Sequence, residues 1–129
     1  MSKKNPTPLE DDEQAAVITA CETLSRFYPE LELLYHIPNG GSRNQIEAAK
    51  LKRLGVRAGV PDLCLPVARG KYHGLYIEMK RQEGGRLSEH QKQWIERLRR
   101  QGYAAIRCDG HQQAVNALLN YMKLEVPEK

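Results

Sequence analysis

Apolar residues recur every three to four positions in three segments of the chain, and this spacing predicts amphipathic helices; a further helix is predicted between a capping-box pattern at Ser42 and the stop at Gly55. The predicted helices cover residues 8–27, 42–54 and 88–101, and a last one follows Gly110 and reaches Met122. Three of them begin with a capping-box pattern, at Thr7–Glu10, Ser42–Gln45 and Ser88–Gln91. Glycines 55 and 102 are expected to end the second and third helices.

Four short apolar segments between these helices predict β-strands over residues 33–37, 62–67, 75–80 and 103–108. The glycine-rich, basic connection between the second and third strands suits a hairpin. Pro66 is expected near a strand end or on an edge. The order is therefore α-β-α-β-β-α-β-α, which predicts an α/β fold with a mixed β-sheet flanked by α-helices. We expect one domain over residues 1–129, with its core at about 8–123.

Composition narrows the class of protein. With 40% hydrophobic and 28% charged residues, the chain matches a folded globular domain rather than a disordered one. No apolar run approaches the ~20 residues of a membrane span, and the N-terminus lacks the apolar segment of a secretory signal. Three widely spaced cysteines argue against a disulfide scaffold or a cysteine-rich zinc site and favour a reducing compartment. We therefore expect a cytoplasmic protein with no membrane partner.

Charge is distributed unevenly along the chain. The net charge is +4, but residues 1–34 carry −4 and residues 35–129 carry +8. A basic body of this kind favours a polyanionic partner such as nucleic acid, through steering and counterion release. The alternative from charge alone is an ordinary solvated basic surface.

The candidate chemistry lies in two of the predicted strands. Side chains alternate along a strand, so Glu78 and Lys80 share one face while Ile77 and Met79 share the other. If Asp62 begins the antiparallel partner strand, its carboxylate approaches that of Glu78, because paired strands lie ~5 Å apart. Two such carboxylates suit Mg²⁺, which prefers oxygen ligands, and a bound metal ion makes water a better nucleophile.

Lys80 completes a minimal set of groups for metal-assisted phosphodiester hydrolysis, because its ammonium can orient the water or neutralise transition-state charge. The alternative is a Glu-x-Lys pair on an exposed strand, which occurs often as a surface ion pair. The apolar residues that bracket both segments and the proline before Asp62 favour the functional interpretation.

The combined motifs resemble the VRR-NUC domain, the virus-type replication-repair nucleases of the PD-(D/E)xK superfamily. The resemblance rests on Gly59-Val60-Pro61-Asp62-Leu63, on residues 74–80 (Gly-Leu-Tyr-Ile-Glu-Met-Lys), on Gly84, Leu87, Ser88 and Gln91, and on Gly102-Tyr103. It covers residues 10–122 and implies a restriction-endonuclease-like fold with Mg²⁺- or Mn²⁺-dependent DNA cleavage. Small stand-alone members resemble phage or prophage proteins that act as homodimers on branched DNA, including four-way Holliday junctions.

Carried over by this resemblance, Asp62 and Glu78 correspond to metal ligands, Lys80 to the catalytic lysine and the Met79 backbone carbonyl to a further ligand. A first-helix glutamate in the family approaches the metal through water. Glu13 fits this role by its sequence context, and Glu10 and Glu22 are the alternatives. Gln91 corresponds to a family glutamine near the site or the DNA, although its place in the capping box is an equally good structural reason for it.

Polar and basic residues around these motifs are candidates for DNA contacts. The set comprises Asn39, Ser42, Arg43, Lys50, Lys52, Arg53 and Arg57 before Asp62, and Lys71, Arg81 and Arg86 around the hairpin. None of the four histidines has zinc-ligand spacing. Trp94 lies on the apolar face of its helix, which predicts a core or dimer-interface residue rather than a platform on which bases stack. Besides a structure-selective nuclease, the residues leave open a non-catalytic DNA-binding module and a sequence-specific restriction-type endonuclease.

Overall fold

The computed structural model describes residues 9–38 and 44–128. A four-stranded sheet has the strand order β1-β2-β3-β4, in which β2 (Leu63–Leu65) is antiparallel to both β1 (Tyr35–His36) and β3 (Leu75–Lys80). The last strand, β4 (Ala104–Asp109), runs parallel to β3. This is the mixed α/β architecture that the sequence predicts, with the elements in the predicted order.

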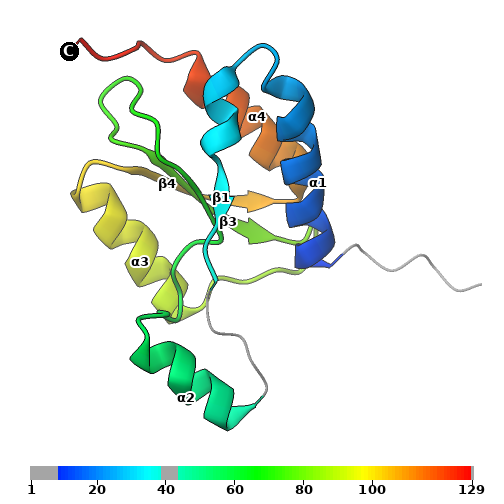
Figure 1. Ribbon diagram of the computed structural model, residues 1–129, viewed down its shortest axis with the longest axis vertical. Helices are drawn as coiled ribbons and strands as arrows, with labels where there is room; N and C mark the ends of the chain where they lie inside the picture. Colours follow the sequence, from blue (N-terminus) through cyan, green and yellow to red (C-terminus); the bar gives the residue numbers. More distant parts are fainter. Residues whose placement is uncertain (1–8, 39–43, 129) are drawn as a thin grey trace, which may run out of the picture.

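The helices lie on both faces of the sheet (Figure 1). Helix α1 (Glu10–Leu24) packs beside α4 (His111–Met122) on one face, and α3 (Glu89–Arg100) lies against β4 from the other side. Helix α2 (Gln45–Arg53) projects from the body, and none of its residues is buried. In the described ranges, no helix combines the length and the apolar character that a membrane span requires.

The core lies between the α1–α4 face and the strands. Alternate residues of β2 and β3 turn inward, and their buried side chains meet Val17 of α1 and Leu118 of α4. The inward residues of the strands are Leu63, Leu65, Leu75, Ile77 and Met79. Because these positions fill the core, residues 76, 78 and 80 of β3 face the other side of the sheet. The core therefore determines the face on which Glu78 and Lys80 lie.

Two predicted capping boxes are wrong and one is confirmed. Helix α1 begins at Glu10 after Leu9, and Thr7 lies outside the described residues. Helix α2 is capped by Asn44, whose side chain accepts hydrogen bonds from the backbone of Ile46 and Glu47. Asparagine is as good an N-cap as serine, which is why the pattern placed the helix start two residues early.

At α3 the predicted box is present: Ser88 accepts from the Gln91 backbone, and the Gln91 side chain accepts from the Ser88 backbone.

Two element boundaries differ from the prediction: the start of the first strand and the end of the first helix. The predicted strand 33–37 is reduced to two residues, because a 3₁₀ helix, η1 (Pro29–Leu33), occupies the preceding segment. The first helix ends at Leu24 rather than at Phe27, whose side chain is 74% exposed. Pro66 follows β2 directly, as its missing N–H predicts.

Candidate active site

The start of β2 and the end of β3 bring two carboxylates together. Leu63 pairs with Ile77, so continuation of the antiparallel register places Asp62 opposite Glu78. The Asp62 Oδ2 atom accepts a 2.8 Å hydrogen bond from the Met79 backbone N–H, which fixes the aspartate against β3. The Asp62 carboxyl group raises the pKa of Glu78 through its charge and as a hydrogen-bond partner, and Glu78 lowers the pKa of Asp62 as a hydrogen-bond partner. The expected approach of the two acids is therefore present.

Both acids of this pair are held in an environment that disfavours charge. Glu78 is 2% exposed, and burial together with the neighbouring Asp62 raises its pKa to about 9, against the opposing charge of Lys80. Burial also raises the pKa of Asp62, although the Met79 N–H, Glu78 and the charges of His36 and Lys80 oppose it. The Glu78 Oε2 atom is buried without a hydrogen-bond partner. A cation is the natural partner for such an oxygen.

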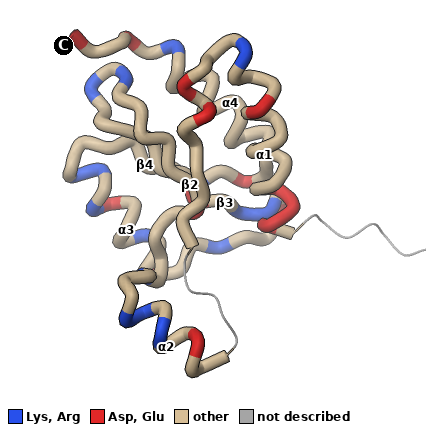
Figure 2. The backbone as a smooth tube through the Cα atoms, in the orientation of Figure 1, with Lys and Arg blue, Asp and Glu red and all other residues tan. Residues whose placement is uncertain are grey.

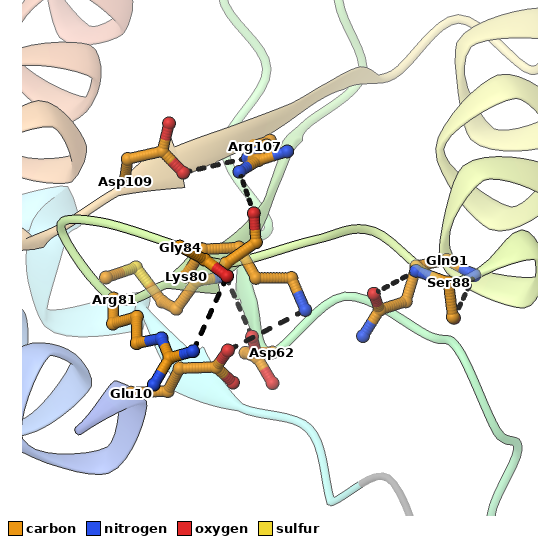
Figure 3. Close-up of polar contacts among 11 residues, drawn as sticks. Glu10, Asp62, Lys80, Arg81, Gly84, Ser88, Gln91, Arg107 and Asp109 are labelled. Atoms are coloured by element: carbon orange, nitrogen blue, oxygen red, sulfur yellow. Dashed lines mark hydrogen bonds and ion pairs between the residues drawn. The ribbon is translucent and has the colours of Figure 1, made fainter.

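Lys80 lies on the same face of β3, two residues beyond Glu78. Its side chain is buried, and its Nζ atom is 3.7 Å from Glu10 Oε1 of α1 (Figure 3). A Cβ atom on Gly85 would lie 2.9 Å from Lys80 Cβ, so only glycine lets the loop after β3 approach the lysine this closely. The backbone of this loop therefore packs against the aliphatic part of the lysine side chain.

The first-helix glutamate beside this group is Glu10 and not Glu13. Glu10 approaches Lys80, and its charge contributes to the raised pKa of Glu78. Glu13 instead directs its carboxylate to the start of α4, where it accepts from Gln82 Nε2 at 2.8 Å and from the backbone and ring nitrogens of His111. The arrangement disfavours the predicted metal-supporting role of Glu13, because its oxygens already serve as the cap of α4.

Glu22, the other alternative, is exposed and lies three helical turns away from Glu10. Glu10 is at the first position of α1 and not in the predicted capping role, so its side chain can reach toward β3. Figure 2 shows the acidic first turn of α1 beside the basic end of β3.

We expect Glu13→Ala to lower the free energy of unfolding by about 1–3 kcal/mol, because it removes the buried carboxylate that accepts from the His111 backbone and from Gln82. Burial raises the pKa of Glu13, but the hydrogen bonds from His111 and Gln82 outweigh it and the net shift is downward. The contribution is therefore complete above the ordinary pKa of 4.5 and is lost as the pH falls through the lowered value.

Urea melts of Glu13→Ala and of the exposed control Asp12→Ala, at pH 7 and at pH 3, measure this contribution. Equal stability of the two variants at pH 7 would contradict the capping role of Glu13.

Gln91 lies in the cap of α3, and Figure 3 shows it apart from the Asp62–Lys80 group. Its Oε1 atom accepts from the Ser88 backbone at 2.8 Å, so the acceptor of this amide is used by the cap. The predicted role of Gln91 at the site or on DNA rests on its remaining amide donors.

The predicted basic residues separate into three places. Lys50, Lys52 and Arg53 form the last turn of α2, and Arg57 follows it; all four are exposed. Arg81 and Arg86 flank the loop after β3 and line a hollow of about 350 Å³ together with Glu10. Lys71 was grouped with them, but the structure places it in the turn at the opposite end of β3. Asn39, Ser42 and Arg43 lie outside the described residues.

Arg107 is a neighbour of the site that the sequence analysis missed. It pairs with Glu78 in the parallel register of β3 and β4. Its guanidinium donates to Asp109 Oδ1 at 2.8 Å and to the Gly85 carbonyl at 2.6 Å (Figure 3). Arg107 thus ties the loop after β3 to the sheet. The only sequence signal for it was the alternation within strand 103–108, which does not reveal the register with β3.

The acid pair fits a divalent cation of the Mg²⁺ type. No group of three or more His, Cys, Asp and Glu side chains suited to a metal occurs within residues 9–38 and 44–128. Mg²⁺ commonly needs only one or two carboxylates, and waters and substrate phosphates complete its coordination. Asp62 and Glu78 supply those two carboxylates, and the unpaired Glu78 Oε2 atom is an oxygen that such an ion would satisfy.

Comparison with known proteins gives two findings. Residues 10–112 match the family model described as VRR-NUC domain. The fold is similar to a solved structure described as "VRR_NUC domain protein", with a TM-score of 0.78 and 34% sequence identity; the match covers 92% of this chain and 91% of the other. No curated protein matches the chain at a significant level.

Proposed function

Since the chain belongs to the VRR-NUC domain family of nucleases, we propose that it is a divalent-metal-dependent endodeoxyribonuclease that cuts branched DNA, including four-way junctions. The observation that carries the proposal is the buried pair Asp62 and Glu78, with Lys80 on the same face of β3. Such a pair is unfavourable for the fold alone, because burial and mutual repulsion raise the pKa of Glu78 to about 9.

In this proposal Asp62, Glu78 and the Met79 backbone carbonyl hold Mg²⁺ or Mn²⁺. When bound, such an ion supplies Lewis-acid stabilisation of phosphate charge and lowers the pKa of water. Asp62 is oriented for this task by the hydrogen bond from the Met79 N–H. Glu78 must lose its proton to act as a ligand, which couples ion binding to pH.

Lys80 acts on the attacking water or on the charge that develops at the phosphate. Its side chain is buried against Gly85 and its ammonium lies beside Glu10, so it is held in place before the substrate arrives. Glu10 takes the supporting role of the first-helix glutamate, which the sequence assigned to Glu13 with Glu10 as an alternative. Gln91 is a further candidate for contact with the substrate through its amide nitrogen.

The DNA would be selected by shape and backbone contacts, because the chain carries no recognisable base-reading module. The cations available beside the acid pair are Arg81 and Arg86, and those of α2 and Arg57 extend the basic surface. One site of this kind cuts one strand, so two coordinated cuts in a junction require two copies. We therefore propose a homodimer, with a mass in solution of twice 14.7 kDa.

Incubation of the purified chain with labelled duplex, flap, splayed-arm and four-way DNA tests the proposal. With Mg²⁺ or Mn²⁺ we expect cleavage of the branched substrates and none in EDTA. Junction binding without cleavage under either ion would instead support a non-catalytic DNA-binding module. Cleavage of plain duplex at one recurring sequence would support a restriction-type endonuclease.

A further inference from the structure

An aromatic groove of about 500 Å³ lies next to the acid pair and is not used by the chemistry above. It is lined by Tyr35 and His36 of β1, Tyr76 of β3, Trp94 of α3 and Arg57, among others. Tyr35 is 49% exposed, and Tyr76 and Trp94 are half-buried. Trp94 is therefore not a core residue, because its ring borders an open hollow, and its alternative role at a dimer interface stays a prediction.

The groove and the acids share one face of the sheet. Tyr35 and Tyr76 both pair with Cys64 across the strands, so the two tyrosines flank Cys64 in one row. Asp62 and Glu78 are two residues farther along the same strands, a distance of ~7 Å.

His36 contacts both the groove and Asp62. It lines the groove, and its Nδ1 atom lies 2.9 Å from the Asp62 carbonyl oxygen. A nucleotide in the groove would therefore lie beside the backbone of Asp62.

Hydrogen bonds and one ring contact hold the aromatic side chains of the groove in place. Trp94 Nε1 donates to the Ala58 carbonyl at 3.1 Å. The Tyr76 ring lies edge-on to Tyr103, with centroids 5.3 Å apart. Cys64 raises the pKa of Tyr35 as the hydrogen-bond partner of its hydroxyl. These aromatic faces are therefore positioned before any ligand binds, which lowers the entropy cost of binding.

We propose that this groove takes an unpaired nucleotide of the DNA strand that is cut, next to the scissile phosphate. Every base has a π-face that stacks on tyrosine or tryptophan regardless of sequence. Arg57 lies on the groove, and α2, which precedes it, ends in three cations, so the charge here is complementary to a phosphate backbone. A base in a duplex must first leave its pair to enter, so the groove selects DNA with an unpaired or readily extruded base at the cut.

This inference rests on the proposed nuclease function, but its test reads binding. The chain has one tryptophan, Trp94, which lines the groove, so intrinsic tryptophan fluorescence reports on the surroundings of this one ring. We would titrate Lys80→Ala, in Mg²⁺, with a duplex that carries one unpaired nucleotide and with the matching fully paired duplex. We expect quenching of Trp94 and tighter binding with the unpaired nucleotide.

On that background, Tyr35→Ala is expected to weaken binding of the unpaired-nucleotide DNA by about 5- to 100-fold, the value of one stacked base, and to leave paired-duplex binding within about twofold. Tyr35→Phe keeps the ring and should retain the preference. Phe27→Ala removes an exposed ring elsewhere and is the matched control. Should Tyr35→Ala fail to fold, Tyr35→Leu keeps apolar volume without a π-face and should show the same loss.

Equal weakening on both DNAs, no weakening, or unchanged Trp94 fluorescence would overturn the groove assignment. The assignment and the nuclease function can fail separately. If the wild-type chain binds the unpaired-nucleotide DNA more tightly but never cuts it, the nuclease proposal fails and the groove assignment stands. If the chain cuts DNA without any preference for an unpaired nucleotide, the groove assignment fails and the nuclease proposal stands.

Discussion

Replacing Asp62 with asparagine is expected to lower metal-dependent cleavage of branched DNA by about a thousandfold. Asparagine keeps the size of the side chain but removes the charge that faces Glu78 and the shared ion. The charge stabilisation that a metal supplies is worth several kcal/mol, and each 1.4 kcal/mol is a factor of ten in rate. Binding of the junction should persist, because the change removes a negative charge from a surface that meets phosphates. Single-turnover cleavage and gel-shift titrations measure the two quantities.

Lys80→Ala is the companion variant for this prediction. We expect a loss of about 10²–10³-fold in cleavage, the usual cost of one positioned electrostatic group, with junction affinity retained. Asp12→Asn on α1 and Lys92→Ala on α3 change exposed residues of the same types and serve as controls. If Asp62→Asn or Lys80→Ala cleaved at the wild-type rate, the assignment of the site would be wrong.

Glu78→Gln is expected to inactivate the nuclease and to stabilise its ion-free fold. The pKa of Glu78 is raised from 4.5 to about 9, so the folded state binds more protons than the unfolded state between these values. The free energy of unfolding of the wild type therefore falls as the pH rises through this window. Glutamine is neutral at every pH and avoids that loss. At pH 8 in EDTA we expect a gain on the order of 2–4 kcal/mol, since one pKa unit corresponds to about 1.4 kcal/mol.

Thermal and urea melts of both chains at pH 5 and pH 8 measure this effect. Glu83→Gln, an exposed glutamate in the loop after β3, is the control and should change neither stability nor its pH dependence. Addition of Mg²⁺ should stabilise the wild type and leave Glu78→Gln unchanged, because a ligand stabilises only the state that binds it. A Glu78→Gln variant that is less stable than the wild type at pH 8 would contradict the claim that the buried environment of this residue disfavours its charged form.

The sequence predicts the order of elements because each depends on local chemistry. Hydrophobic periodicity predicts α1, α3 and α4, capping and stop residues predict α2, and alternation within residues 75–80 predicts that Glu78 and Lys80 lie on the face opposite the core. The proximity of Asp62 to Glu78 followed from an antiparallel hairpin, whose register is set by the core residues of both strands. These features involve neighbours in sequence or one short connection.

The details that prediction missed depend on contacts between distant segments. Glu13 and Glu10 are both acids in the first turn of α1, and only the packing of α1 against α4 decides that Glu13 meets His111 while Glu10 meets Lys80. Arg107 comes beside Glu78 through a parallel pairing whose register no local pattern reveals. Lys71 does not join Arg81 and Arg86 in one set, because the hairpin turn that holds Lys71 and the loop that holds the two arginines lie at opposite ends of β3.

The central claim is that Asp62 and Glu78 share one divalent ion. X-ray diffraction from crystals grown with saturating Mn²⁺, recorded where manganese scatters anomalously, locates that ion directly. We predict one anomalous peak between the two carboxylates, with an oxygen of each at about 2.1 Å, and its disappearance in Glu78→Gln. A well-ordered acid pair with no peak between its members, in crystals that hold Mn²⁺ elsewhere, would contradict the account.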